Sequence, residues 1–264
     1  MLQVNNLEVT YSNILVVVRG VSLRVGDGEV VALLGSNGAG KSTLLKAISG
    51  MLTFELGKVT EGSITYNGES IDGLSPTDIV KKGIFQVFEG RPVCEHLTVE
   101  ENLLIGAYSR KDSRRDIAND LDMVYSYFPS LVRMKGRTAG YISGGERQML
   151  VVGRGLLAKP SLILLDEPTL GLGPLIVEEF FRILERLNIE QRIAILLVEQ
   201  NARAALSLAS YAYVMENGRV VLDGPSDDLM RNEDIKEFYL GLSKAGRRSY
   251  KDVKHYKRRK RWLG

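Results

Sequence analysis

Eight consecutive residues near the start of the chain have the types and spacing that phosphate binding requires. Residues 35–42 spell GSNGAGKS and directly follow the apolar run VVALL at 30–34. The glycines allow backbone conformations closed to other residues, so that successive N–H groups can turn toward an anion. Lys41 would reach the β- and γ-phosphates of a nucleotide, and the Ser42 hydroxyl would bind Mg²⁺.

The residues on either side favour a P-loop over the alternative, a glycine-rich turn with a chance lysine. A strand-forming run precedes the string, and a helix is expected to start around Thr43, with its positive N-terminus aimed at the phosphates. The expected nucleotide-binding residues are Gly35, Ser36, Asn37, Gly38, Ala39, Gly40, Lys41, Ser42 and Thr43.

Two adjacent acids follow another apolar run, LILL at 162–165. The carboxyl end of a parallel strand is where α/β sheets bind ligands. Asp166 suits a Mg²⁺ ligand acting through water, and Glu167 is placed to accept a proton from, or to orient, a water that attacks the γ-phosphate. The alternative is a strand that merely ends in solvated acids. The P-loop upstream favours the first interpretation, a Walker B strand.

A third string, YISGGERQ at 141–148, lies between these two sites in the sequence. Ser143 and Glu146 have capping-box spacing, so a helix should begin here with its N–H groups and dipole directed outward. Gly144 and Gly145 leave bare backbone near the helix start, as close approach to a phosphate requires. An ordinary capped helix is the alternative.

The elements that must hold these residues indicate an α/β fold. Residues 2–25 alternate apolar and polar side chains and predict antiparallel strands around a turn at Ser12 and Asn13. After residue 160, short apolar strands separated by helices predict a mainly parallel sheet covered on both faces. Residues 97–158 are rich in helix formers and are interpreted as a helical insertion.

Composition narrows the class of protein. With 264 residues, 44% of them hydrophobic, the chain can bury a full core. Cys94 is the single cysteine and there are two histidines, which excludes an intrachain disulfide and argues against a zinc centre. No apolar run approaches the roughly 18 residues of a membrane-spanning helix. Residues 1–8 lack the pattern of a secretory signal, so we expect a cytosolic chain.

Positive charge is concentrated in a C-terminal tail, residues 244–264. The tail holds ten basic residues and one acid, so the other 25 basic and 31 acidic residues give positions 1–243 a net charge of −6. The overall charge of +3 therefore gives no reason to expect a nucleic-acid partner. A solvated terminus is the favoured interpretation of the tail. Contact with anionic lipid, with Trp262 at the interface, is the alternative.

Taken together, the P-loop, the Ser-Gly-Gly-Glu string and the acid pair resemble those of the ATP-binding cassette (ABC) family, over nearly the whole chain. The resemblance implies ATP and Mg²⁺ as ligands and makes 1–243 an ABC ATPase domain with an antiparallel β subdomain and an inserted helical subdomain. It also implies a dimer in which Ser143, Gly144, Gly145 and Glu146 of one subunit close over the γ-phosphate held by the other. Tyr11 would stack on adenine, although an ordinary strand tyrosine is the alternative.

Three positions depart from the general pattern of that family. Glu89 falls where a metal-sensing glutamine is usual, and Gln86, three residues earlier, is the alternative for that role. Gln200 stands where many relatives have a histidine, and its amide can donate to the γ-phosphate without carrying charge. Gly173 stands where the family usually has an aspartate, in the loop that contacts the other subunit of the dimer. With these departures the chain resembles the ATPase subunits of importers of branched-chain amino acids and their urea or amide relatives.

That resemblance implies several partners at the cytoplasmic face of the cell membrane. They are a second ABC ATPase subunit, either another copy of this chain or a related one, two transmembrane permease subunits and, indirectly, a substrate-binding protein. Residues 91–102 and the helical insertion would contact the permease. The alternatives are a lipid or polysaccharide exporter, a soluble cassette of translation or DNA repair, and a nucleotide sensor that scarcely hydrolyses.

Overall fold

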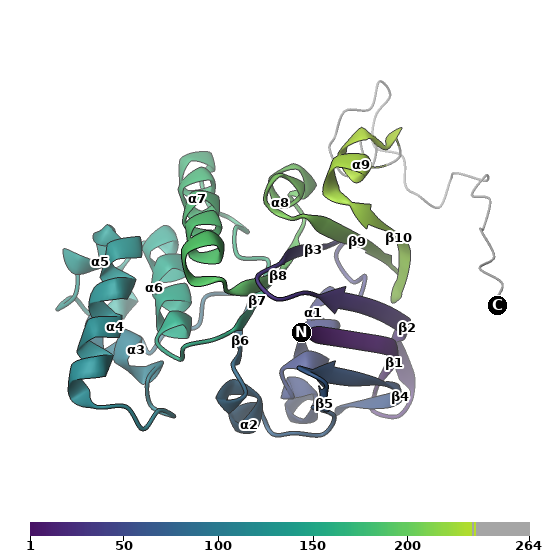
Figure 1. The fold of residues 1–264 in the computed structure, drawn as a ribbon, viewed down its shortest axis with the longest axis horizontal. Helices are drawn as coiled ribbons and strands as arrows, with labels where there is room; N and C mark the ends of the chain where they lie inside the picture. The colour runs from purple at the N-terminus through teal and green to yellow at the C-terminus, as the bar shows by residue number, and fades with distance from the viewer. Residues whose placement is uncertain (234, 236–264) are drawn as a thin grey trace.

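The chain forms two β-sheets and a set of helices that cover them. The structure is a computed structural model and describes residues 1–233 and 235. The basic tail predicted at 244–264 lies outside the described residues. In Figure 1, helices α3 to α6 lie at one end of the molecule and the smaller sheet lies at the other.

The smaller sheet is the predicted antiparallel start of the chain. Its strands are β1 (Leu2–Tyr11), β2 (Leu15–Val25), β4 (Gly57–Tyr66) and β5 (Glu69–Ser70), in the order β2-β1-β4-β5. β1 and β2 join through Ser12 and Asn13, both with positive φ, and this confirms the predicted turn. Asn67 and Gly68 form a second turn of positive φ between β4 and β5.

The larger sheet has six strands in the order β10-β9-β3-β8-β7-β6. Its members are β3 (Val30–Gly35), β6 (Ile84–Val87), β7 (Leu162–Asp166), β8 (Ala194–Glu199), β9 (Tyr211–Glu216) and β10 (Arg219–Pro225). β9, β3, β8, β7 and β6 pair in parallel, and only the edge strand β10 is antiparallel to its neighbour. The mainly parallel sheet is thus confirmed.

The run before the P-loop is apolar throughout because both of its faces are buried. Val31 and Leu33 pack into a core shared with the antiparallel sheet and helix α1 (Lys41–Ile48). Val30, Ala32 and Leu34 point the other way, into the core under the large helices. Successive strand residues face opposite sides, so a strand between two layers needs every position apolar. Helix α1 therefore packs between the two sheets.

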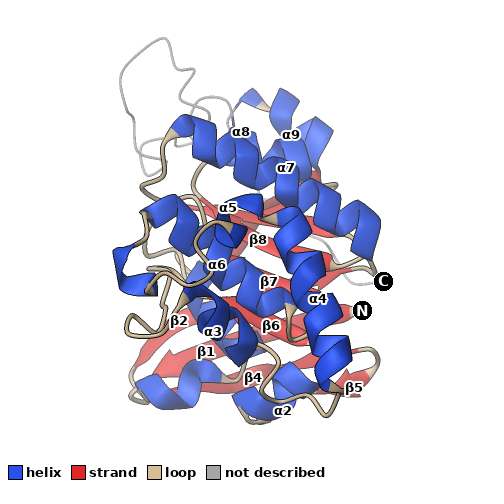
Figure 2. Cartoon of the chain, turned by 90° about the vertical axis from the view of Figure 1, so that its left-hand side faces the viewer, coloured by secondary structure: helices blue, strands red, loops and turns tan. Residues whose placement is uncertain are grey.

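The remaining helices lie mainly over one face of the larger sheet, as Figure 2 shows. Residues 99–156 carry α3 (Val99–Ile105), α4 (Arg114–Tyr127), α5 (Pro129–Val132) and α6 (Gly144–Leu156). Next follow α7 (Pro174–Gln191), α8 (Ala202–Leu208) and α9 (Ser226–Arg231), while α2 (Pro76–Lys81) precedes β6. Short 3-10 turns occupy Met51–Glu55 and Ala139–Tyr141. None of the helices in the described part of the chain is long and apolar enough to cross a membrane.

Between β6 and β7 the described chain forms helices and no strand, which agrees with the helical character expected for 97–158. Two of its helices start at capping boxes, Thr98 with Glu101 for α3 and Ser143 with Glu146 for α6. The domain boundaries themselves stay a prediction.

The end of α3 meets α6 so closely that only glycine fits at the contact. A Cβ atom on Gly106 would lie 1.9 Å from the carbonyl oxygen of Arg154. We therefore expect Gly106→Ala to lower the free energy of unfolding by about 1–3 kcal/mol, the usual cost of overpacking. Urea unfolding would measure it. The control is Gly136→Ala, where a Cβ meets nothing within 4 Å, and equal stability of the two variants would contradict this packing.

Candidate nucleotide-binding site

The predicted P-loop joins β3 to α1 and lines a cavity of about 360 Å³. Gly38 and Gly40 have φ values of 79° and 101°, so both need glycine as predicted. The turn between β9 and β10 braces the loop, because the Gly218 N–H donates to the Ala39 carbonyl at 3.0 Å. The Gly218 carbonyl in turn accepts from the Arg19 N–H at 2.8 Å. The cradle is therefore fixed by strands from both ends of the described chain.

Gly35 is glycine for a different reason from the one predicted. It was expected to supply an unusual backbone conformation, yet it ends β3 and is absent from the described residues with positive φ. A Cβ atom here would lie 2.4 Å from the carbonyl oxygen of Met215 on β9. The close approach of two strands, rather than a left-handed backbone, excludes a side chain.

Lys41 is almost completely buried at the first turn of α1. Its Nζ donates to the carbonyl oxygens of Gly35 at 2.9 Å and Ser36 at 3.0 Å. It also lies 3.3 Å from Oε1 of Glu167. The ammonium group is thus held at the mouth of the loop, where it could interact with a phosphate.

Two of the three residues expected at the Mg²⁺ site, Ser42 and Asp166, are in direct contact with each other. The Ser42 hydroxyl donates to Oδ1 of Asp166 at 3.0 Å, although 124 positions separate them. Both side chains offer oxygen atoms, the ligands Mg²⁺ prefers, and Mg²⁺ sites commonly take one or two protein carboxylates together with phosphates and water. The described residues contain no group of three or more His, Cys, Asp or Glu able to hold a metal.

Burial raises the pKa of Asp166 to about 6, and the negative charges of Glu167 and Glu89 add to that rise. The hydrogen bond from Ser42 and the positive charge of Lys41 act in the opposite direction. An aspartate in this position therefore opposes folding once it is ionised, unless a cation arrives to balance it.

Glu167 and Gln200, the expected catalytic pair, are in direct contact. The Gln200 amide Nε2 donates to Oε2 of Glu167, and both residues line the P-loop cavity. Glu167 has a φ of 45°, a strained backbone for a non-glycine residue, fixed by its N–H bond to the Val198 carbonyl at 2.9 Å. The structure thus brings Lys41, Glu167 and Gln200 together at one cavity. Their catalytic roles stay predictions.

The geometry separates the two candidates for the metal-sensing position. Glu89 lines the P-loop cavity, whereas Gln86 lines a different groove beyond β6. Gln86 is buried, and its Oε1 accepts a 2.5 Å hydrogen bond from the Ser49 hydroxyl. Its place at the P-loop cavity therefore favours Glu89 over Gln86 for the metal-sensing role.

Tyr11 lies at the end of β1, close to the start of α1. Its hydroxyl donates to Oγ1 of Thr43 at 3.5 Å, and its half-buried ring packs beside Gly57, where a Cβ would come within 2.9 Å of the ring. Stacking on adenine stays a prediction.

The Ser-Gly-Gly-Glu string lies apart from the P-loop of the same chain. Ser143 and Glu146 form the predicted capping box, with the Ser143 N–H donating to Glu146 Oε2 at 2.6 Å. Among the described residues that line the P-loop cavity, none comes from 143–146. One chain alone therefore does not bring this string to the nucleotide site.

The sequence predicted no contact within the chain for two well-connected residues, Arg91 and Glu199. Arg91 lies two positions after Glu89, and its Nε donates to Gln148 Oε1 on α6 at 3.1 Å. Its Nη2 donates to the Leu170 carbonyl, in the segment after Glu167. Burial lowers the pKa of Arg91. These partners lie 57 and 79 positions away, so no local pattern could have identified them.

A phosphate-binding loop after β3, an acid pair at the end of β7 and a helical segment between β6 and β7 together define an ATP-binding cassette. The family model described as ABC transporter matches residues 18–170. The chain therefore belongs to the ABC transporter family, and it is an ATPase of that family.

Individual relatives agree with that assignment. The chain is 45% identical over 233 residues to BraG of Pseudomonas aeruginosa, a high-affinity branched-chain amino acid transport ATP-binding protein, covering 88% of this chain and 96% of BraG. It is 36% identical to LivF of Archaeoglobus fulgidus, a probable protein of the same kind (84% and 91% covered). The solved ADP conformation of MJ1267, an ATP-binding cassette of an ABC transporter, matches with a TM-score of 0.78 at 27% identity (91% and 98% covered).

Asp166→Asn should stabilise the full chain when unfolding is measured without nucleotide or Mg²⁺. Folding raises the pKa of Asp166 from 3.8 to about 6, so the wild-type residue favours the folded state at low pH. This contribution is complete below about pH 4 and is lost as the pH rises through 6. The neutral variant should therefore gain stability between pH 4 and 6 and hold a gain of about 3 kcal/mol above pH 7.

Urea unfolding from pH 4.5 to 8 would measure this gain. Asp122→Asn, at an exposed position on α4, is the matched control for losing one negative charge. A gain that does not change with pH, or an equal gain in the control, would contradict the burial of an ionised Asp166.

Proposed function

We propose that the chain is the ATP-hydrolysing subunit of an importer of branched-chain amino acids. The observation that carries the catalytic part is the meeting of Lys41, Glu167 and Gln200 at the P-loop cavity. The substrate class rests on the likeness to BraG and LivF, both named for branched-chain amino acid transport. LptB of Haemophilus influenzae, a lipopolysaccharide export protein, is less similar, at 32% identity.

We assign parts in hydrolysis to six residues that line this cavity or contact one that does. Lys41 exchanges its contact with Glu167 for the γ-phosphate, which frees the Glu167 carboxylate to accept a proton from the attacking water. Gln200 donates its amide N–H groups to Glu167 or to the phosphate and so orients both. Ser42 and Asp166 would hold Mg²⁺, which would supply positive charge to offset that of the phosphates. Glu89 lines the same cavity, and its negative charge opposes that of the phosphates.

A second subunit completes the site. Residues 143–146 do not line the cavity of their own chain, yet they present a helix N-terminus with bare backbone at Gly144 and Gly145. An anion is favoured at such a terminus. Facing subunits related by a two-fold axis would each place this string over the nucleotide of the other.

The permease would dock in the apolar groove beyond β6, and so hold the chain at the cytoplasmic face of the membrane. This groove has a volume of about 470 Å³, and α2, β6, the end of α3 and α6 form its walls. Ile105 and Tyr108 line it and are exposed, Tyr108 to 92%. Exposed apolar side chains that gather around a groove are typical of a protein-binding surface. A substrate-binding protein would deliver the amino acid to the permease.

Glu167→Gln should lower the turnover rate for ATP by about 100-fold or more, since an amide cannot accept the proton. Nucleotide affinity should stay near the wild-type value, because Lys41 and the loop are unchanged. Steady-state hydrolysis and equilibrium nucleotide binding by the chain assembled with its permease would measure both. Wild-type turnover in this variant would overturn the assignment of Glu167 as the base.

Two inactive variants should restore activity when mixed. Lys41→Ala removes the phosphate contact, and Ser143→Asp keeps an N-cap acceptor but places negative charge where a phosphate would bind. In a mixed dimer with shared sites, both defects fall in one site and the other site is intact. Random pairing would restore about a quarter of wild-type hydrolysis, whereas a mixture as inactive as its parents would overturn a site shared between two copies of this chain.

Ile105→Asp should weaken binding to the permease subunits by about 10-fold or more, because it places a charge in the apolar groove. Co-purification from detergent-solubilised membranes would measure it. The matched control is Ile189→Asp, an exposed isoleucine on α7 that does not line the groove. Equal permease binding by the two variants would contradict docking at this groove.

A further inference from the structure

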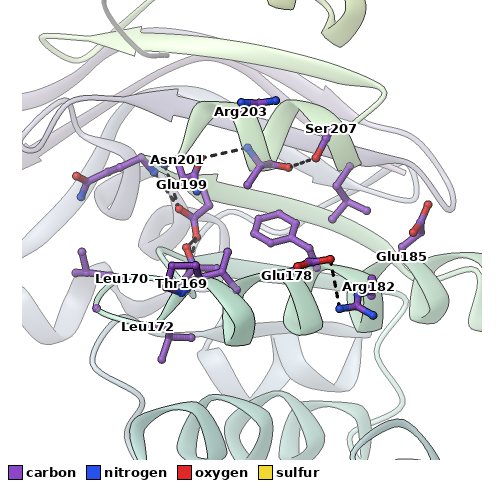
Figure 3. A pocket seen from close by; sticks show the side chains of 17 residues that line it. Thr169, Leu170, Leu172, Glu178, Arg182, Glu185, Glu199, Asn201, Arg203 and Ser207 are labelled. Atoms are coloured by element: carbon purple, nitrogen blue, oxygen red, sulfur yellow. Dashed lines mark hydrogen bonds and ion pairs between the residues drawn. The ribbon is translucent and has the colours of Figure 1, made fainter. Parts of the chain in front are cut away.

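Glu199, the last residue of β8, carries a buried carboxylate at the junction of two loops. Its side chain is only 3% exposed. Oε1 accepts hydrogen bonds from the Thr169 N–H at 3.0 Å and the Thr169 hydroxyl at 2.5 Å. Oε2 accepts from the Gln200 N–H at 3.1 Å and the Asn201 N–H at 3.4 Å. Figure 3 shows the carboxylate between Thr169 and Asn201, beside the cavity that separates α7 from α8.

The contacts suit an ionised carboxylate. All four partners point a hydrogen atom at Glu199, and an ionised carboxylate can only accept. Glutamine would keep one oxygen but turn an N–H group toward the backbone donors of Gln200 and Asn201. Burial raises the pKa of Glu199, and the bonds from Thr169, Asn201 and Gln200 oppose that rise.

The contacts of Glu199 close a ring that includes both proposed catalytic residues. Glu167 is two positions before Thr169, and Thr169 is bonded to Glu199. Glu199 is followed by Gln200, whose amide returns to the Glu167 side chain. The two halves of the catalytic pair lie on different loops, and Glu199 adds a buried side-chain link between those loops to the backbone bond from Glu167 to Val198.

We propose that Glu199 is a positioning residue that holds Gln200 and Glu167 in register for ATP hydrolysis. Glu199 does not line the P-loop cavity, so it acts on the reaction through Gln200 rather than on the nucleotide. The inference rests on the proposed roles of Gln200 and Glu167. The geometry of the contact between Gln200 and Glu167 then depends on the buried carboxylate of Glu199.

Hydrolysis by Glu199→Gln in the assembled transporter tests the inference. Turnover should fall about 10-fold or more, since small misplacements of reacting groups are costly, while the KM for ATP stays within about twofold because the P-loop is untouched. Thr169→Val, which removes only the bond to the Thr169 hydroxyl, should give a smaller loss. Thr169→Ser keeps that hydroxyl and should match the wild type. If Glu199 had a purely structural role, turnover would not fall step by step across these variants while the KM for ATP stayed constant.

The decisive comparison uses Gln200→Ala as background. If Glu199 acts through Gln200, Glu199→Gln should cause no further loss of turnover there. The same loss in both backgrounds, or wild-type turnover in Glu199→Gln alone, overturns the inference. Should Glu199→Gln fail to fold, the Thr169→Val effect and its disappearance in Gln200→Ala make the same test. Wild-type turnover in Gln200→Ala would instead overturn the role of Gln200 itself, and the inference with it.

Discussion

The parallel pairing of β8 between β3 and β7 is the constraint on which the rest of the site depends. Leu34 pairs with Glu199, and Asp166 pairs with Val198. Since the three strands run in the same direction in register, their carboxyl ends reach one edge together. The P-loop, the acid pair and the Glu199–Gln200 segment therefore converge without any long loop to carry them. Three separate stretches of sequence become one cavity because of backbone hydrogen bonding.

The cost of that convergence is a set of buried charges. Lys41, Asp166, Glu167 and Glu199 are all largely withdrawn from water, and each is held by specific hydrogen bonds or an ion pair. Asp166 and Glu199 have raised pKa values because desolvation outweighs their partners. Such an arrangement is not optimal for folding stability. It is suited to receive a ligand that brings both negative phosphates and a cation.

The sequence was sufficient for the elements whose signals are local. Apolar runs, a capping box at Ser143 and the glycine-lysine string predicted strands, helix starts and the P-loop, because each depends on neighbours a few positions away. Gly35 was misinterpreted, since its reason is contact with Met215 on another strand. Arg91 and Glu199 were missed because their partners are distant in sequence. To choose between Glu89 and Gln86, one must know which of them lines the P-loop cavity. Gln86 lies within β6 and lines the other groove, whereas Glu89 follows the strand, and spacing in the sequence cannot show this difference.

The brace from Gly218 to Ala39 has a consequence for how the chain is made. Synthesis runs from the N-terminus, so the phosphate-binding loop leaves the ribosome long before the turn that supports it. Until β9 and β10 have been added, the loop lacks that support. The tight contact between Gly35 and Met215 is also missing. A nascent chain thus carries the complete motif without its shaped cradle. The ability to capture nucleotide arrives only when the described fold is almost entirely translated.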